Sequence, residues 1–116
     1  MEIMASDRQE DRTFYCKLVR DKIPQIIKKS GKKPIIDTLD DEEFEIFLER
    51  KLDEEVKEYH DSKEAEELAD ILEVLIALAK LKGLSFADLM DMQVKKAVKK
   101  GSFKKKILLK AVCETE

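Results

Sequence analysis

The sequence has no tryptophan, only three glycines and two prolines, and 6 % aromatic residues among its 116 residues. Glycine and proline are the residues that most often interrupt helices, so their scarcity leaves long stretches that can remain helical. Charged residues, in contrast, make up 42 % of the chain. This balance is typical of a helical protein rich in lysine and glutamate. A chain of this length forms one domain, and oligomerisation would help to stabilise it.

Cysteine and long apolar runs are also scarce. The two cysteines, Cys16 and Cys113, have no CxxC spacing, and nothing resembles a secretory signal peptide. The most apolar run, LADILEVLIALAKL at residues 68–81, contains three charged residues and is too short to span a bilayer. We therefore expect a reduced, cytoplasmic protein that does not bind membranes.

The net charge of −3 hides a strong asymmetry along the chain. Between Asp40 and Glu73 there are sixteen acids and four bases, whereas from Lys95 onward eight lysines face two glutamates. An acidic middle that attracts cations and a basic end that meets phosphates would together suit a metal–nucleotide substrate. Solvated helix faces produce the same statistics, so the asymmetry leaves both interpretations open.

Residues 1–13 are polar and lack an apolar period, which predicts a flexible leader before a single domain at residues 14–116. A short helix follows, for which Asp21 is the expected cap, with Pro24 in the first turn and Gly31 at the end. An extended connector follows it. Three longer capped helices are then predicted: from Asp40 to about His60, from Asp61 or Ser62 (with Glu64 completing a capping box to Asp61) to Gly83, and from Ser85 to Gly101.

Acidic residues fall on the apolar faces of two of these helices. At 100° per residue, Glu55 lies inside the stripe formed by Leu48, Leu52 and Tyr59, and Glu58 lies on its edge. An ionised carboxylate that leaves water without a partner costs several kcal/mol, so inward acids need a reason. Glu45 lies near the same stripe, and position alone therefore does not prove a role.

The second long helix has two apolar faces, one with Leu68, Leu72 and Leu75 and a nearly opposite one with Val74 and Leu81. Glu67 and Asp70 continue the Val74 face by one turn toward the N-terminus, so both should face a protein interface. Three helices cannot easily bury two faces of one helix. We therefore predict an all-α helical bundle that is completed by homo-oligomerisation, as a homodimer at least.

Two pairs of acids, Glu55 with Glu58 and Glu67 with Asp70, have an i,i+3 spacing that places both carboxylates on neighbouring positions of one helix. Antiparallel helices joined by a short turn would bring the two pairs together. Four acids in one place repel each other unless divalent cations bind, and oxygen ligands suit Mg²⁺ or Mn²⁺ rather than zinc. A di-iron site would need Glu-x-x-His pairs, which the single histidine, His60, does not form.

The segment KLDEEVKEY, followed by EELADILEVLIALAKLKGLS, resembles the EExxE and ExxD signature of the MazG-type all-α nucleotide pyrophosphohydrolases. The segments KLVRDKIPQII and KKAVKKGSFKKKILL further resemble a phosphoribosyl-ATP pyrophosphohydrolase-like subgroup. The resemblance covers roughly residues 15–112. The two acidic motifs are moderately specific separately and stronger together.

The resemblance implies a MazG-like domain that hydrolyses a nucleoside triphosphate, or a related nucleotide such as phosphoribosyl-ATP, to the monophosphate and pyrophosphate. It also implies that Glu55, Glu58, Glu67 and Asp70 hold Mg²⁺, with Mn²⁺ as a substitute. Glu54, or Glu55 as a metal-bridging carboxylate, would accept the proton of the attacking water. For such a chain we expect a housekeeping role in the removal of aberrant nucleotides.

Expected phosphate contacts come from both ends of the chain. Arg20 and Lys22 lie at the start of the short helix, whose free N–H groups favour anions. Lys95, Lys96 and Lys99 lie on the last helix, and exposure to solvent explains all of these lysines equally well. The subgroup tends to have an Arg-Gly-Gly-Phe-like element, where this chain has Lys100-Gly101-Ser102-Phe103. Lys100 retains the positive charge of the first arginine but lacks its bidentate geometry for phosphate.

Two other functions compete with hydrolysis. The first is a non-catalytic helical module that binds nucleotide or protein. In such a module the inward acids would have no functional role. Nucleic-acid binding through the lysine-rich end is disfavoured, because KKAVKKGSFKKK offers a single aromatic residue, Phe103, and no stacking series.

Overall fold

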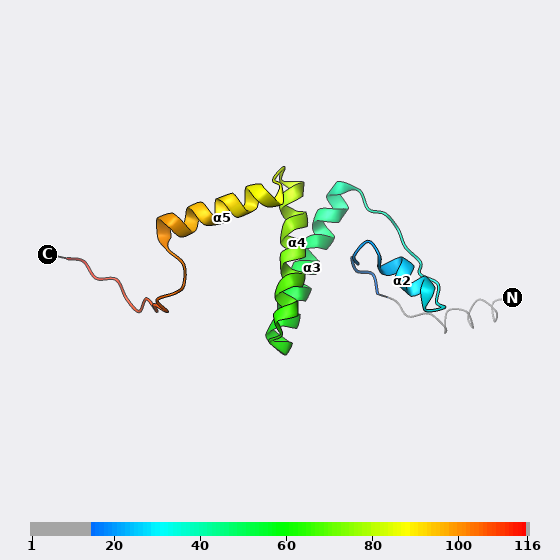
Figure 1. The fold of residues 1–116 in the computed structure, drawn as a ribbon, viewed down its shortest axis with the longest axis horizontal. Coiled ribbons are helices and arrows are strands. Elements are labelled where there is room, and N and C mark those ends of the chain that lie inside the picture. The colour runs from blue at the N-terminus through cyan, green and yellow to red at the C-terminus, as the bar shows by residue number, and fades with distance from the viewer. Residues whose placement is uncertain (1–14, 116) are drawn as a thin grey trace. The chain divides into compact units, whose positions relative to one another are not determined.

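The computed structural model describes residues 15–115, which form helices and no strand. Its elements are α2 (Ile23–Lys29), α3 (Asp41–Ser62), α4 (Ala65–Leu81) and α5 (Phe86–Lys100) (Figure 1). The all-α prediction is confirmed for this part of the chain, and the predicted leader, residues 1–13, lies outside it. The described part of the chain divides into two compact units, the first ending at Val74 and the second beginning at Leu75.

Helix α2 begins after Lys22, and the prediction that Asp21 caps it is wrong. Lys22 occupies the cap position with helical dihedral angles, φ −90° and ψ −5°, and no side chain accepts a hydrogen bond there. Pro24 lies in the first turn, as expected, where its missing N–H costs no helical bond. After Lys29 the chain leaves the helix through Ser30 and Gly31, and Gly31 has a positive φ of 89°.

Helix α3 starts at the predicted cap, since the Asp40 carboxylate accepts a hydrogen bond from the Glu43 amide at 2.9 Å. The helix continues beyond His60 to Ser62 and ends at Lys63, whose φ of 60° is left-handed. The Lys63 amide donates to the Tyr59 carbonyl at 2.7 Å, which satisfies one carbonyl of the last turn.

The connection from α3 to α4 consists of Lys63 and Glu64. Because Asp61 and Ser62 belong to α3, neither is the N-cap of α4, and the predicted capping box between Asp61 and Glu64 is wrong. The Ser62 hydroxyl instead accepts a hydrogen bond from the Glu64 amide at 3.1 Å. A connection this short makes consecutive helices neighbours.

Helix α5, in the second unit, starts at the predicted cap, Ser85, which forms a capping box with Asp88. The Ser85 hydroxyl accepts from the Asp88 amide at 3.1 Å, and the Asp88 carboxylate accepts from the Ser85 amide at 3.0 Å. These bonds hold the pKa of Asp88 below its ordinary value. The helix ends before Gly101, which has a φ of 88°.

The two apolar faces of α4 differ in burial. Val74, on one face, is buried, as are the adjacent Leu78 and Leu48 of α3. Ala79 is also buried, although helical spacing places it one turn beyond Leu75 on the same side as the leucines. Leu68, Leu72 and Leu75, on the other face, are 50 %, 41 % and 38 % exposed. The leucine face of α4 therefore lacks a cover among the described residues.

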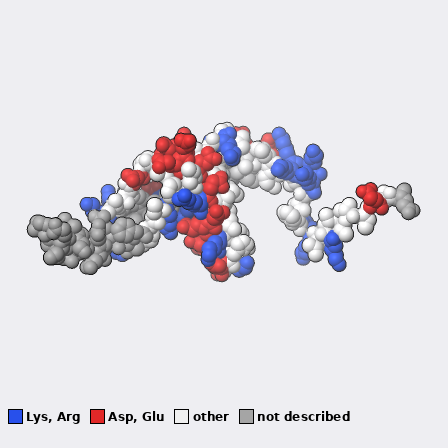
Figure 2. All heavy atoms as spheres, turned by 180° about the vertical axis from the view of Figure 1, so that it is seen from behind, with Lys and Arg blue, Asp and Glu red and all other residues white. Residues whose placement is uncertain are grey.

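Charged groups segregate on the surface as the sequence indicates. In Figure 2, acidic side chains gather over α3 and the first part of α4, and lysines gather toward the end of α5. Within residues 15–115, the structure contains no helix with the length and apolar character needed to cross a membrane.

Candidate metal centre

Three carboxylates converge where the end of α3 meets the start of α4. Glu55, Glu67 and Asp70 each offer an oxygen atom, and the three oxygens lie within 4.8 Å of one another. The short connection places the last turns of α3 beside the first turns of α4, and the i,i+3 spacing of Glu67 and Asp70 directs both side chains to the same side. We call these residues the carboxylate cluster. It contains three of the four predicted metal ligands.

Glu55 is the most deeply buried member of the cluster. It is 6 % exposed, and it is the buried charged residue of the described chain. One carboxylate oxygen, Oε1, lies 3.3 Å from the Lys51 ammonium, whereas Oε2 is buried and has no hydrogen-bond partner. Burial raises the pKa of Glu55 above its ordinary value and the adjacent Glu58 raises it further, while Lys51 acts in the opposite direction. A buried carboxylate oxygen without a hydrogen-bond partner is costly, so it calls for an explanation.

The other two members are half-buried on α4. Burial raises the pKa of Glu67 above its ordinary value, and the negative charges of Asp70 and Glu55 raise it further. The raised pKa of Glu67 therefore reflects burial first and repulsion among the three carboxylates second. Such repulsion is relieved by a proton or by a cation.

Glu58 and Glu54, the remaining predicted acids of α3, lie outside the cluster. Glu58 is exposed and close enough to Glu55 to raise its pKa. Glu54 accepts a hydrogen bond from the Lys51 ammonium at 2.6 Å and lies 3.8 Å from the Lys17 ammonium. Of the two predicted proton acceptors, Glu55 is therefore the one that the structure places in the cluster.

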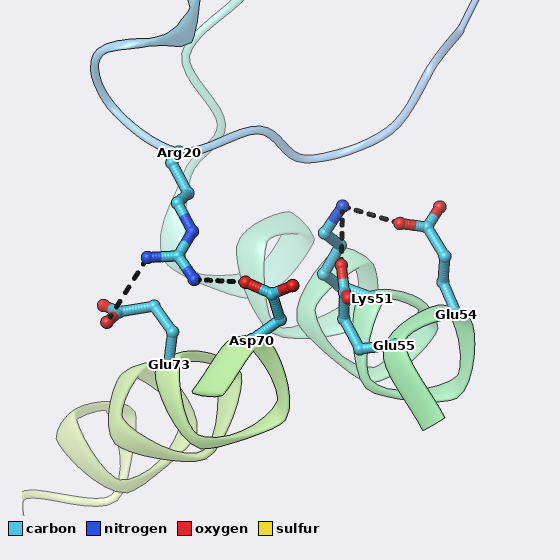
Figure 3. A network of polar contacts seen from close by, with 6 residues as sticks. All are labelled: Arg20, Lys51, Glu54, Glu55, Asp70 and Glu73. Atoms are coloured by element: carbon cyan, nitrogen blue, oxygen red, sulfur yellow. Dashed lines mark hydrogen bonds and ion pairs between the residues drawn. The ribbon is translucent and has the colours of Figure 1, made fainter. Parts of the chain in front are cut away.

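Two cations contact the cluster from opposite sides (Figure 3). Arg20, from the segment before α2, lies 2.6 Å from the Asp70 carboxylate and 3.8 Å from Glu73. Lys51, on α3, points toward Glu54 and Glu55. Although burial opposes it, bonding to these two carboxylates raises the pKa of Lys51. Arg20, a predicted phosphate ligand, thus lies at the carboxylates, and Lys51 was missed by the sequence analysis.

No contact among the described residues places the other predicted phosphate-binding lysines at the cluster. Lys22 is exposed at the start of α2, a helix of seven residues. Lys95 forms an ion pair with Asp91 at 3.0 Å, and Lys96 and Lys99 are exposed on α5 in the second unit. These four lysines remain candidates from the sequence alone.

The donor atoms of the carboxylate cluster fit a hard divalent cation. All are carboxylate oxygens, which Mg²⁺ and Mn²⁺ prefer, and no histidine or thiol is among them. The unpartnered Oε2 atom of Glu55 supplies a ligand that no protein group uses. Two observations therefore support a metal site: this unpartnered oxygen atom and the concentration of negative charge.

Comparisons with known proteins give little further information. No family model matches the chain, and no solved structure matches it. An uncharacterized protein of Mycolicibacterium smegmatis is 56 % identical over 41 residues, which are 35 % of this chain and 42 % of the relative. The match thus spans less than half the length of either protein.

Proposed function

We propose that this protein is a Mg²⁺-dependent nucleotide pyrophosphohydrolase of the MazG-like type, which cleaves a nucleoside triphosphate or a related nucleotide to the monophosphate and pyrophosphate. The observation that carries the proposal is the buried Glu55, which has an unpartnered Oε2 atom and lies in a cluster with Glu67 and Asp70. An accidental group of acids would be solvated. A buried and unpartnered carboxylate oxygen instead indicates a site shaped for a ligand.

Each residue of the cluster has a role in this proposal. Glu55, Glu67 and Asp70 hold Mg²⁺, or Mn²⁺ in its place, and Glu58 at the rim completes the ligand set. The bound cation supplies charge that offsets the negative charge of the phosphates and lowers the pKa of a bound water. Glu55 would accept the proton of the attacking water, because of the two candidate proton acceptors, Glu54 and Glu55, it is the one in the cluster.

The substrate class comes from the sequence resemblance, and the acidic cluster is compatible with it. A nucleoside triphosphate needs a divalent cation to approach a surface with sixteen acids and four bases between Asp40 and Glu73. Phosphoribosyl-ATP contains the same type of phosphoric anhydride bond and belongs to the substrates proposed. Removal of aberrant nucleotides is the cellular role that we assign to such an activity.

A second candidate function has one observation in its favour. Arg20 and Lys51 already neutralise part of the cluster through ion pairs with Asp70 and Glu55. In a non-catalytic nucleotide-binding or interaction module, these pairs would be purely structural, and removal of divalent cations would change little. Dependence on metal therefore separates the two functions.

The test is pyrophosphate release from a panel of standard and modified nucleoside triphosphates and phosphoribosyl-ATP, with Mg²⁺, Mn²⁺ or EDTA. Wild type is compared with Glu55→Gln and Asp70→Asn, and Asp53→Asn, an exposed acid of α3, serves as the matched control. We expect metal-dependent release that is lost in the first two variants and kept in the control. Release in EDTA, or no release from any of these substrates with either metal, would contradict the proposal.

We also propose that the leucine face of α4, formed by Leu68, Leu72 and Leu75, binds a second copy of the chain. These side chains are exposed on the longest apolar segment of the sequence. Val74, on the opposite face of the helix, is buried. Burial of an equivalent face on a partner would remove them from water in a symmetric manner.

A further inference from the structure

A small recess lies between the segment before α2 and the middle of α3. The segment before α2 contributes Lys17 and Leu18 to its lining, and α3 contributes Arg50, Lys51 and Glu54. Three of these side chains are cationic and one is acidic. The surrounding stretch has the opposite balance, because Asp40–Glu73 contains sixteen acids and four bases. Two of those four bases, Arg50 and Lys51, line the recess, which is therefore a local positive site in an acidic region.

The recess adjoins the carboxylate cluster through one side chain. The Lys51 ammonium lies 2.6 Å from Glu54, which lines the recess, and 3.3 Å from Glu55, which belongs to the cluster (Figure 3). A ligand with several negative charges could thus contact a cation bound at the cluster and the recess at the same time. A phosphate chain with two or more phosphates has this property.

Arg50 is positioned for an anion. Its guanidinium carbon lies 5.0 Å from the centre of the Phe47 ring, which holds the planar group by a cation–π contact. Within residues 15–115, Arg50 forms no ion pair, whereas Lys51 and Lys17 both contact Glu54. The N–H groups of an arginine held in this way match the oxygens of a phosphate in a bidentate manner.

We propose that this recess binds the terminal phosphates of a nucleoside polyphosphate through Arg50 and Lys51, with Lys17 at its rim. The ligand class rests on the proposed function, whereas the site itself is argued from the lining residues. A divalent cation at Glu55 would weaken the attraction between Lys51 and that carboxylate. The Lys51 ammonium, still hydrogen-bonded to Glu54, would then have an N–H donor free for a phosphate oxygen. The recess then holds the group that leaves as pyrophosphate.

Binding of inorganic pyrophosphate, measured by calorimetry in Mg²⁺ and in EDTA, tests the recess without any need for hydrolysis. We expect wild type to bind it and Arg50→Gln to bind at least about tenfold more weakly, since hydrogen bonds to charged groups are lost. Arg50→Lys keeps the charge and should lie between them. Lys57→Gln, which removes an exposed lysine paired with Asp61 on the same helix, should bind as wild type does.

A second arm identifies the part of the nucleotide that the recess binds. A non-hydrolysable nucleoside triphosphate analogue should lose affinity in Arg50→Gln as pyrophosphate does, whereas the affinity for the nucleoside monophosphate should be unchanged. Equal pyrophosphate affinity in wild type and Arg50→Gln, or no pyrophosphate binding by wild type in either condition, would overturn the proposal. Loss of pyrophosphate affinity but not of analogue affinity would restrict the recess to the free product and would also overturn it.

The outcomes for the recess and for the hydrolase are separable. If no nucleotide is hydrolysed but pyrophosphate affinity depends on Arg50, the proposed phosphate site in the recess is supported and the proposed activity is contradicted. If hydrolysis is observed and Arg50→Gln leaves pyrophosphate and analogue binding unchanged, the proposed activity is supported and the proposed phosphate site in the recess is contradicted. Circular dichroism of Arg50→Gln verifies that the helices are intact, which is expected because Arg50 is exposed.

Discussion

The Arg20 guanidinium lies 2.6 Å from the Asp70 carboxylate, although the two residues are 50 positions apart in the sequence. Arg20 also approaches Glu73, one turn further along α4. The segment before α2 is therefore held at the carboxylate cluster by a charge-assisted hydrogen bond. Without a metal, Arg20 supplies positive charge at the point where we propose that a cation binds.

Replacement of Arg20 tests this competition directly. We expect Arg20→Gln to bind Mn²⁺ about two- to fivefold more tightly than wild type, since a partly exposed ion pair of this kind contributes modestly. In EDTA the same variant should unfold at lower temperature, because Asp70 loses its partner. Calorimetry and thermal unfolding measure both effects. Weaker Mn²⁺ binding in Arg20→Gln would show that Arg20 supports the metal site instead of competing with it.

Metal binding should stabilise the fold. If a cation binds the native state alone, Mn²⁺ at a hundred times its dissociation constant raises the free energy of unfolding by about 2.7 kcal/mol. Asp70→Asn should lose most of this increase, and Asp53→Asn, on the exposed side of α3, should keep it. Thermal unfolding with and without metal measures the effect. An equal increase in all three proteins would place the cation elsewhere.

Stability without metal should depend on pH through Glu55. Burial raises its pKa in the folded state above the ordinary value of 4.5, so the folded protein holds a proton that the unfolded chain has lost. The contribution of Glu55 to stability is therefore complete below about pH 4.5. It decreases as the pH rises through the raised folded pKa.

The matched variant for the pH dependence is Glu55→Gln, which cannot titrate at this position. In EDTA, its free energy of unfolding should exceed that of wild type at neutral pH, and the difference should shrink toward pH 4.5. Denaturant unfolding at several pH values measures this. A difference that does not change with pH would show that the Glu55 carboxyl titrates normally.

The leucine face of α4 predicts the oligomeric state. Leu72→Glu places a charge on this face, and we expect it to convert a dimer to a monomer in sedimentation experiments. Ile46→Glu, a change at a residue of α3 that is 52 % exposed, is the control and should remain dimeric. A monomeric wild type would show that the face is not covered by a second copy.

Helical periodicity was sufficient to predict the inward position of Glu55, because α3 is long and its apolar stripe is regular. The spacing of Glu67 and Asp70 likewise predicted that both join it. Glu58 lies on the edge of the same stripe, and a small rotation of the helix decides whether such a residue is covered. Its exposure therefore could not be read from the sequence.

The contacts that the sequence did not predict depend on less regular features. The approach of Arg20 to Asp70 depends on the path of the extended connector between α2 and α3, which has no periodicity. Lys63 adopts a left-handed conformation that lysine rarely takes, so the end of α3 was placed too early. Lys51 did carry a signal, because it precedes Glu55 by one helical turn, the spacing of an ion pair.

The connection through Lys63 and Glu64 has a consequence for how the protein folds. All three carboxylates of the cluster lie between residues 55 and 70, so their convergence requires only the closure of a short loop between adjacent helices. Contacts this close in sequence form rapidly and with little loss of chain entropy. Repulsion among the carboxylates opposes this step, and a divalent cation that screens them would therefore accelerate the formation of the helical hairpin itself.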